Sequence, residues 1–226
     1  MMSDLWVPLL LSLKVASWAT LFAALLGGGV AFILSRWRSP LCNLVDSMLT
    51  LPMVLPPTVI GYYLLVLLGR RGVIGEWLGR FGIELVFTWQ GAVIAATVVA
   101  FPLVLKAARA AFEDVDHRLE DAGLILGLSR AQVFFRVSLP LAMRGIMAGV
   151  LLAFARALGE FGATLMIAGS IPGRTQTLSI AIYEAVQGGN DHFAMVLVAI
   201  TSVTCIVVLW LASLLTPVQQ RHRRLR

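Results

Sequence analysis

The chain has 226 residues, of which 59% are hydrophobic and only 13% are charged, and its mean hydropathy is +0.88. Soluble domains contain roughly 45–50% apolar and about 25% charged residues, so this composition argues against a water-soluble globule and makes the lipid bilayer the expected solvent. The net charge of +6 comes from basic residues clustered between apolar runs. Membrane topology explains such clusters, so nucleic acid is not an expected partner.

Five apolar runs are long enough to cross a membrane, because a helix that rises about 1.5 Å per residue needs about 20 residues to span a hydrocarbon core of about 30 Å. These runs cover residues 15–34, 45–68, 88–105, 141–158 and 195–215. The mixed stretch from 161 to 187 leaves room for a further short or re-entrant segment. We therefore expect an all-α, multi-pass integral membrane protein with about five transmembrane helices, or six if that stretch adds one.

Positive charge predicts how these spans are oriented. Lys and Arg residues collect after the first run, around the loop between the third and fourth runs, and in the tail at 217–226. Lys and Arg in short loops are retained on the cytoplasmic side of a membrane. The N-terminus is therefore expected outside the cell membrane, and the loop and the C-terminus are expected in the cytoplasm.

The chain shows no internal repeat with matching helix breaks in two halves, which an inverted-repeat transporter tends to have. A pseudo-symmetric path across the membrane would then need a second copy. The sequence therefore predicts a homodimer with a path along its two-fold axis.

The polar loop at 113–140, between the third and fourth runs, begins with a predicted short helix. Asp116 is placed as its N-cap. Glu120 and Asp121 lie in its first turn, where carboxylates complement the positive helix end. Gly127 is placed as the C′ residue that ends it.

A second short helix is predicted to follow at once. Ser129 and Gln132 have the spacing of a capping box. Val133 and Val137 continue the apolar stripe, and Leu139-Pro140 is expected to stop the helix. The loop should therefore consist of two short helices around a glycine elbow.

The same loop carries a spaced motif. It consists of Asp121, Ala122, Gly123, Gly127, Val137, Leu139 and Pro140. This spacing resembles the signature loop of ATP-binding-cassette (ABC) importer permeases, whose consensus has Glu-Ala-Ala, then Gly, then Ile-x-Leu-Pro. This chain has Asp for Glu, Gly for the second Ala and Val for Ile. The resemblance implies a coupling helix that docks on a cytoplasmic ATPase dimer, with the motif residues and Glu120 serving that coupling.

Further segments narrow the resemblance. Residues 51–57, 69–72, 154–164 and 171–175 are similar to the corresponding segments of molybdate permeases, and together these similarities extend over residues 10–215. They imply the transmembrane domain of a type I ABC importer with a MetI-like fold, and a substrate-binding protein as an external or periplasmic partner. Sulfate permeases share the 158–160 and 171–172 elements, so sulfate and tungstate remain alternative substrates.

The second apolar run is predicted to be a broken helix, because its three prolines remove backbone donors and disturb carbonyls four residues earlier. Such groups are tolerated at membrane depth only where neighbours, water or substrate satisfy them. We expect this helix to line the translocation pathway and to offer neutral hydrogen-bonding groups to a dianion; a kink used only for helix packing is the alternative. The candidate pathway residues are Thr50, Pro52, Pro56, Pro57, Thr58 and Tyr62.

Arg156 and Glu160 are four residues apart in the fourth run, so their side chains can meet on one side of a helix. Ionisable groups inside a membrane are costly and are usually paired or functional. The pair is therefore expected either to fix the position of the helix or to act near an external gate.

Two other classes of protein compete with an ATP-driven permease. A membrane enzyme is disfavoured because no catalytic spacing is present, and neither a metal-binding nor a nucleotide-binding motif occurs. We therefore expect no catalytic residues, metal or cofactor in this chain, with ATP hydrolysis on a partner chain. An ion-coupled carrier or a channel is the second alternative. Such a protein would transport its substrate without an ATPase subunit, which distinguishes it from an ATP-driven permease.

Overall fold

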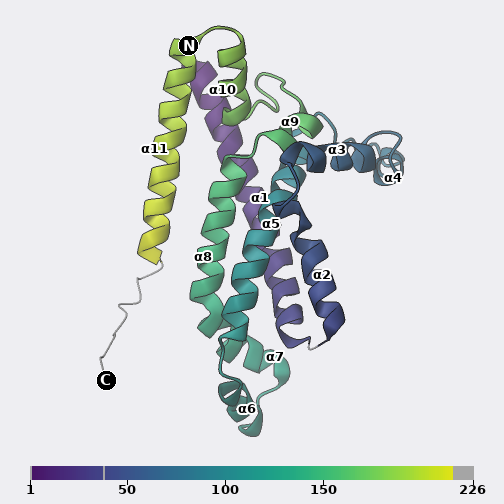
Figure 1. Cartoon of the computed structure of the whole chain (residues 1–226), viewed down its shortest axis with the longest axis vertical. Coiled ribbons are helices and arrows are strands. Elements are labelled where there is room, and N and C mark those ends of the chain that lie inside the picture. The colour runs from purple at the N-terminus through teal and green to yellow at the C-terminus, as the bar shows by residue number, and fades with distance from the viewer. Residues whose placement is uncertain (1, 38, 216–226) are drawn as a thin grey trace.

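The computed structural model describes residues 2–37 and 39–215, and that part of the chain is built from helices (Figure 1). The predicted basic tail at 217–226 lies outside the described residues. In chain order the elements are α1 (Met2–Arg36), α2 (Pro40–Thr50), the 3₁₀ turn η1 (Leu51–Met53), α3 (Pro57–Leu68), α4 (Val73–Gly79), α5 (Trp89–Glu113), α6 (His117–Ile125), α7 (Arg130–Val133), the π-helical turn η2 (Phe134–Ser138), α8 (Leu139–Leu158), α9 (Gly162–Ala168), α10 (Leu178–Gln187) and α11 (Asp191–Leu215).

Four long apolar helices run along the long axis of the molecule (Figure 1). They are Leu5–Arg36, Trp89–Glu113, Arg130–Leu158 and Asp191–Leu211, and each is long and apolar enough to cross a membrane. This result confirms four of the five predicted runs. The fourth helix combines α7, η2 and α8, so it begins well before the predicted run at 141.

The core lies between α1, α5 and α8, and its centre is lined by small side chains. Ala16 and Ala19 of α1 belong to the same buried cluster as Ala96 and Ala100 of α5, and all four are fully buried. Small residues let two helix backbones approach closely, which is how helices associate where lipid offers no hydrophobic driving force. Many other large apolar side chains are exposed, as expected for a chain surrounded by lipid.

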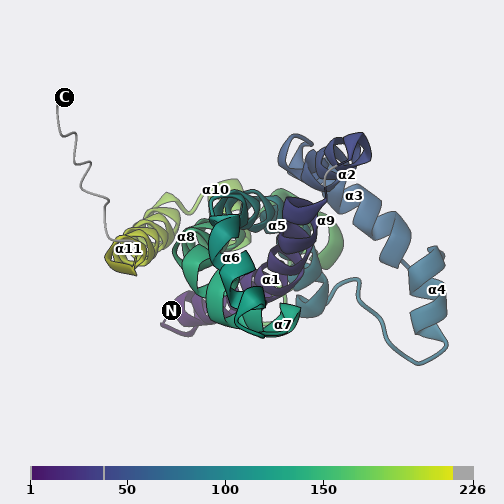
Figure 2. The same ribbon diagram turned by 90° about the horizontal axis from the view of Figure 1, so that it is seen from below.

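The second predicted run is bent, which confirms the predicted break. Pro40–Met53 and Pro57–Leu68 meet at an angle of 104° across a short break. The break falls at the prolines, because Pro56 has an extended ψ of 135° and Pro57 starts α3 at a position where no backbone donor is needed. As a result α2 runs beside the bundle, while α3 and α4 extend sideways from it (Figures 1 and 2).

The stretch from 161 to 187 contains two short helices, α9 and α10. They have 7 and 10 residues, so neither is long enough to cross a membrane by itself. The start of α10 is attached to α1, because the Leu178 N–H donates to Ser12 Oγ at 2.7 Å. The short helices therefore add to the end of the bundle rather than forming a sixth full span.

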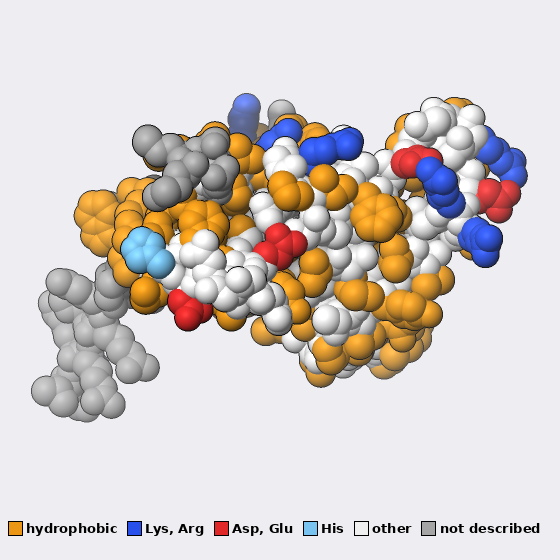
Figure 3. All heavy atoms as spheres, turned by 90° about the horizontal axis from the view of Figure 1, so that it is seen from above, with side chains coloured by type: hydrophobic (Ala, Val, Ile, Leu, Met, Phe, Trp, Pro, Cys, Tyr) orange, Lys and Arg blue, Asp and Glu red, His pale blue; other side chains and the backbone are white. Residues whose placement is uncertain are grey.

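The molecule has two distinct ends. One end, which we name the loop end, carries α6 and α7 beside the last turn of α1 (Figures 1 and 2). The opposite end, which we name the hairpin end, carries the start of α1 and the turn between α10 and α11. Seen from the hairpin end, charged side chains gather at the edge where α4 lies (Figure 3). There Arg70 pairs with Glu84 at 2.9 Å and Arg80 pairs with Glu76 at 3.2 Å, both in exposed positions.

Candidate coupling and translocation sites

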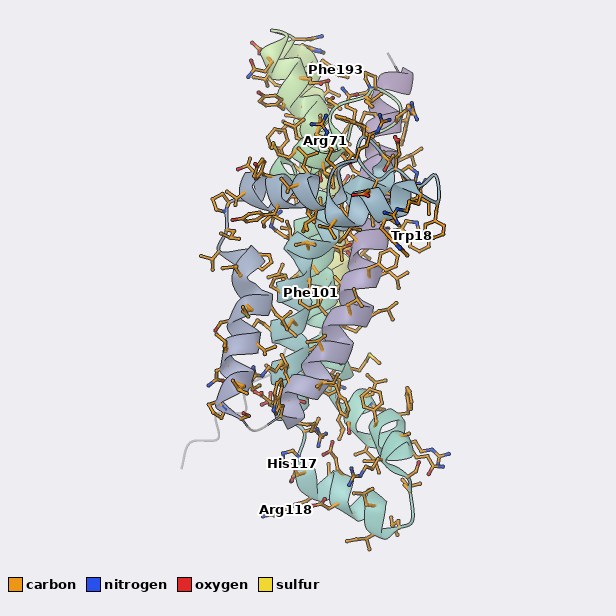
Figure 4. The ribbon with its side chains drawn as sticks, turned by 90° about the vertical axis from the view of Figure 1, so that its right-hand side faces the viewer. Trp18, Arg71, Phe101, His117, Arg118 and Phe193 are labelled. Atoms are coloured by element: carbon orange, nitrogen blue, oxygen red, sulfur yellow. The ribbon has the colours of Figure 1, made fainter. Side chains whose placement is uncertain are left out.

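The first helix of the loop begins and ends where the sequence predicts. Asp116 accepts a hydrogen bond from the Arg118 N–H at 2.9 Å and caps α6. Gly127 has φ +86° and follows the last turn of α6, so it occupies the left-handed position that favours glycine. The Leu128 N–H reaches back to the Gly123 carbonyl at 3.1 Å, which completes the helix end. Figure 4 shows His117 and Arg118 at this loop end, far from Phe193 at the hairpin end.

The second loop helix has the predicted start but not the predicted end. Ser129 and Gln132 form the capping box, with the Ser129 N–H donating to Gln132 Oε1 at 2.8 Å. The expectation that Leu139-Pro140 stops the helix is wrong, because the helix continues through η2 into α8. A proline ring clashes with the carbonyl four residues earlier in a regular α-helix. The wider π turn just before Pro140 relieves that clash, so the loop joins α8 without a break.

Glu120 is the most heavily bonded residue of the loop. It is only 6% exposed, and both of its oxygens accept hydrogen bonds from the Arg36 guanidinium at the end of α1. Ser138 Oγ donates to the same carboxylate at 2.5 Å, and His117 Nδ1 lies 3.3 Å from it. The Arg36 guanidinium, aided by Ser138 and His117, outweighs burial and lowers the pKa of Glu120 to about 2. Glu120 thus lies in the first turn as predicted, but its carboxylate binds α1 and η2.

The remaining motif residues divide into a packed set and an exposed set. Gly123 is buried, and a Cβ there would lie 3.1 Å from Val133 Cγ2, so a small residue permits α6 to pack on α7. Val137 and Leu139 are half-buried. The exposed motif residues are Asp121, Ala122, Gly127 and Pro140.

The tip of the loop is apolar and open. Ile125 is 85% exposed and Leu126 is 82% exposed, and Leu119 is also exposed. A separate cavity of about 900 Å³ lies between the end of α1 and the two loop helices, where Glu120 and Leu124 are among its lining residues. Apolar side chains this exposed at the water-facing tip of a loop form the kind of surface that binds another protein.

The predicted pathway residues lie on the bent pair α2–α3. Thr50 is half-buried and donates to the Asp46 carbonyl at 2.8 Å, so its hydroxyl is satisfied within its own helix. Pro56, Thr58 and Tyr62 are exposed, and Tyr62 is 55% exposed. Pro52 and Pro57 are half-buried. Whether these residues line a pathway stays a prediction.

The bent pair meets the segment that follows α8. A Cβ on Gly61 of α3 would lie 2.6 Å from Met166 Cβ and 2.9 Å from the Ala163 Cα, so α3 and α9 approach as closely as glycine allows. Gly162 packs in the same way against Pro57. We name this surface the α3–α9 contact. It joins two motifs that are about a hundred residues apart in the sequence.

Arg156 and Glu160 form the predicted ion pair. Arg156 Nη1 lies 2.6 Å from Glu160 Oε2, and the Glu160 side chain is 1% exposed. The other Glu160 oxygen accepts the Ala163 N–H at 2.9 Å, so the carboxylate also caps the start of α9. The pair therefore connects α8 to the α3–α9 contact. Its role as a gate stays a prediction.

The sequence reasoning missed Asp46. This residue of α2 is 9% exposed and forms ion pairs with Lys106 and with Arg109 Nη1, the latter at 3.0 Å, so it ties α2 to α5. Arg109 also pairs with Glu113 at 2.7 Å. A single acid inside an apolar run was the available signal, because ionisable groups in membrane spans are usually paired or functional.

Long apolar helices around a small-residue core, with a structured loop at one end, are the architecture of a multi-pass membrane protein. Comparison with known proteins gives the family: residues 15–222 match the model of the binding-protein-dependent transport system inner membrane component. The chain belongs to this family.

The chain is similar to the molybdenum transport system permease protein ModB of Escherichia coli K12, with 47% identity over 92% of this chain and 93% of that protein. It is 43% identical to the putative molybdenum transport system permease protein YvgM of Bacillus subtilis, over 92% and 89% of the two chains. The sulfate transport system permease protein CysT of E. coli is 37% identical over 75% of this chain and 61% of that protein.

Among solved structures, the fold is similar to that of the MetNI methionine ABC transporter, with a TM-score of 0.73 at 16% identity over 96% of both chains. A bacterial importer of the acidic polysaccharide alginate gives a TM-score of 0.71 at 17% identity, over 93% of this chain and 78% of that chain. These similarities confirm the predicted type I ABC importer fold.

Proposed function

We propose that this chain is the permease subunit of an ATP-driven importer that carries molybdate across the inner membrane. The observation that carries the proposal is the high identity, over nearly the whole chain, to permeases named for molybdenum transport. Sulfate is the second candidate substrate, because a sulfate permease is also similar over three quarters of the chain. Tungstate is a further alternative, because it is a tetrahedral dianion like molybdate.

The proposed mechanism is alternating access in a homodimer. A binding protein delivers the oxyanion at the hairpin end, which faces outside together with the N-terminus. An ATPase dimer binds the loop end in the cytoplasm and hydrolyses the ATP. This chain therefore contributes the translocation path and the loop that transmits the ATPase movement, but no catalysis. The exposed apolar tip at Ile125 and Leu126 supports the docking step, because its burial would stabilise a complex with the ATPase.

Within the dimer, the broken span forms the wall of the path. Thr58 and Tyr62 are exposed on α3 and offer neutral hydroxyl groups to a passing dianion. Neutral groups suit transit because a buried cation would hold a dianion tightly. The Arg156–Glu160 pair lies beside the α3–α9 contact and is proposed to transmit gate movements at the outer side. In a Glu160→Gln variant, unchanged assembly together with unchanged transport-coupled ATP hydrolysis would exclude this gate role.

The function is tested by reconstituting the chain in liposomes with its ATPase and binding protein. We expect ATP-dependent molybdate uptake that unlabelled molybdate suppresses. Competition with tungstate and sulfate in the same assay ranks the three anions. Uptake that continues without the ATPase would instead favour a channel or an ion-coupled carrier.

The docking step has its own test. Replacing Ile125 and Leu126 by Ser removes apolar surface worth about 1.5–3 kcal/mol for each fully buried side chain, so ATPase affinity should fall at least about tenfold. Val73, which is 82% exposed on α4, provides the matched control, because Val73→Ser removes an equally exposed apolar group away from the loop. Equal effects of the loop and control variants would contradict the docking surface.

Orientation and assembly are tested separately. Cysteine labelling from outside the cell should reach the hairpin end and not the loop end. Cysteines placed along 50–62 should be labelled from water on one face of the helix if α2–α3 lines the path. Crosslinking in membranes should yield a dimer of this chain.

A further inference from the structure

Three elements meet at one carboxylate at the loop end. Arg36 is the last residue of α1, His117 is the first residue of α6, and Ser138 is the last residue of η2, directly before α8. All three contact Glu120, which is itself in α6. The helix at the tip of the loop is therefore bound to the ends of two membrane spans through one side chain.

The geometry of this group resists rotation of α6. The Arg36 guanidinium binds both oxygens of Glu120, and such a two-point contact fixes direction as well as distance. Ser138 Oγ donates a further hydrogen bond to Glu120 Oε1 at 2.5 Å, and the Glu120 carboxylate is shielded from water. A buried charge that loses its partners is costly, so the group favours a single orientation of α6 relative to α1 and α8.

The neighbouring acid behaves differently. Asp121 is exposed and forms no ion pair within the described residues. Adjacent residues of α6 thus point in different directions, with Asp121 free to meet another protein and Glu120 bound within the chain. Asp121 is therefore available to contact a partner, whereas Glu120 keeps the loop rigid.

We infer that Glu120 is a positioning residue that makes α6 move as one body with the ends of α1 and α8, and so sets how much of the ATPase movement reaches the membrane spans. The inference rests on the proposed function. Without the Glu120 group, α6 would remain docked on the ATPase but would rotate on its two connecting turns, and ATP would be hydrolysed with little transport.

The test compares Glu120→Gln and Arg36→Gln with wild type in liposomes that contain the complete complex. Both variants should retain the ATPase, and the ratio of anion imported to ATP hydrolysed should fall about tenfold, a typical coupling effect. The double variant should be no worse than either single one, because both remove the same interaction. Glu76→Gln, which breaks an exposed ion pair of the same type on α4, is the matched control.

Restoring the connection chemically separates positioning from simple stability. In a background with Cys42→Ser and Cys205→Ser, Arg36→Cys and Glu120→Cys are combined and joined with a bismethanethiosulfonate crosslinker. The ratio should rise toward the wild-type value after crosslinking. A pair within α6, Glu120→Cys with Leu124→Cys, should show no such recovery, because its crosslink does not reach α1.

The outcomes are distinguishable. Absence of ATP-driven uptake by the wild-type complex would contradict the proposed function itself. With wild-type uptake present, an unchanged ratio in Glu120→Gln, a loss of ATPase binding, or no recovery on crosslinking would each overturn this inference. Should Glu120→Gln fail to fold, Ser138→Ala removes one of the three residues that contact the carboxylate, and an unchanged ratio in that variant would also overturn the inference.

Discussion

The loop end and the α3–α9 contact hold helices together in different ways. At the loop end, Glu120 of α6 binds α1, η2 and a residue of its own helix through charge and hydrogen bonds. At the α3–α9 contact, Gly61 and Gly162 allow backbones to approach until there is no space for a side chain. Charged groups keep a fixed direction in a region that water can reach, whereas close packing of small residues suits a membrane, where an unpaired polar group is costly. Substitutions in the two regions should therefore have different effects on stability and function.

The largest effect is expected at the α3–α9 contact. Gly61→Ala places a Cβ 2.6 Å from Met166 Cβ and 2.9 Å from the Ala163 Cα, and backbone cannot move aside cheaply. We expect destabilisation of about 1–3 kcal/mol, as for an overpacked core, and loss of transport. Gly28→Ala on α1 is the control, because a Cβ there meets nothing within 4 Å. Thermal unfolding in detergent measures both, and equal Tm values for the two variants would refute close packing as the cause.

The next effect is expected at Asp46. Asp46→Asn leaves Lys106 and Arg109 without their shared carboxylate, although Lys106 is half-exposed and can turn to water. We expect destabilisation of about 1–2 kcal/mol, at or below the lower part of the range of about 1.5–3 kcal/mol for a hydrogen bond to a charged group, because Lys106 can turn to water. In a double-mutant cycle with Lys106→Gln the two effects should be less than additive. Strict additivity would show that the pair does not tie α2 to α5.

A smaller and more local effect is expected at Gly127. Its φ of +86° is unfavourable for a residue with a Cβ, so Gly127→Ala should cost about 1 kcal/mol. The strain falls on the loop, so ATPase binding should weaken while thermal unfolding of the membrane bundle changes little. Gly79→Ala, in open space on α4, is the control. A comparable loss of ATPase binding in both variants would argue against the glycine elbow.

The smallest effect is expected from pH. The pKa of Glu120 is lowered from 4.5 to about 2, so the folded protein holds the carboxylate ionised more strongly than the unfolded chain does. Its contribution to stability is therefore fully present above pH 4.5 and is lost as the pH falls toward 2. The Tm difference between wild type and Glu120→Gln should stay constant from about pH 8 to pH 5 and shrink below that. A difference that changes between pH 5 and 8 would place the titration elsewhere.

Local sequence patterns determined much of this protein. The Ser129–Gln132 capping box, the Gly127 helix end and the Arg156–Glu160 pair each involve residues within four positions of one another or a single backbone angle. The break at Pro56-Pro57 follows from the missing backbone donors of proline itself. Four of the long apolar spans could be predicted for a related reason, since the thickness of the bilayer sets their length.

Only the tertiary structure decided which distant groups meet. Arg36 lies 84 positions from Glu120, and Lys106 lies 60 positions from Asp46, so neither ion pair can be predicted from local sequence spacing. The contact of Gly61 with Ala163 depends on how α3 turns at the break and where α9 begins. The helix also continues past Pro140 because of a π turn, and the sequence pattern does not predict that turn. Hydrophobicity and backbone chemistry act over a few residues, whereas ion pairs and close packing depend on the mutual placement of whole helices.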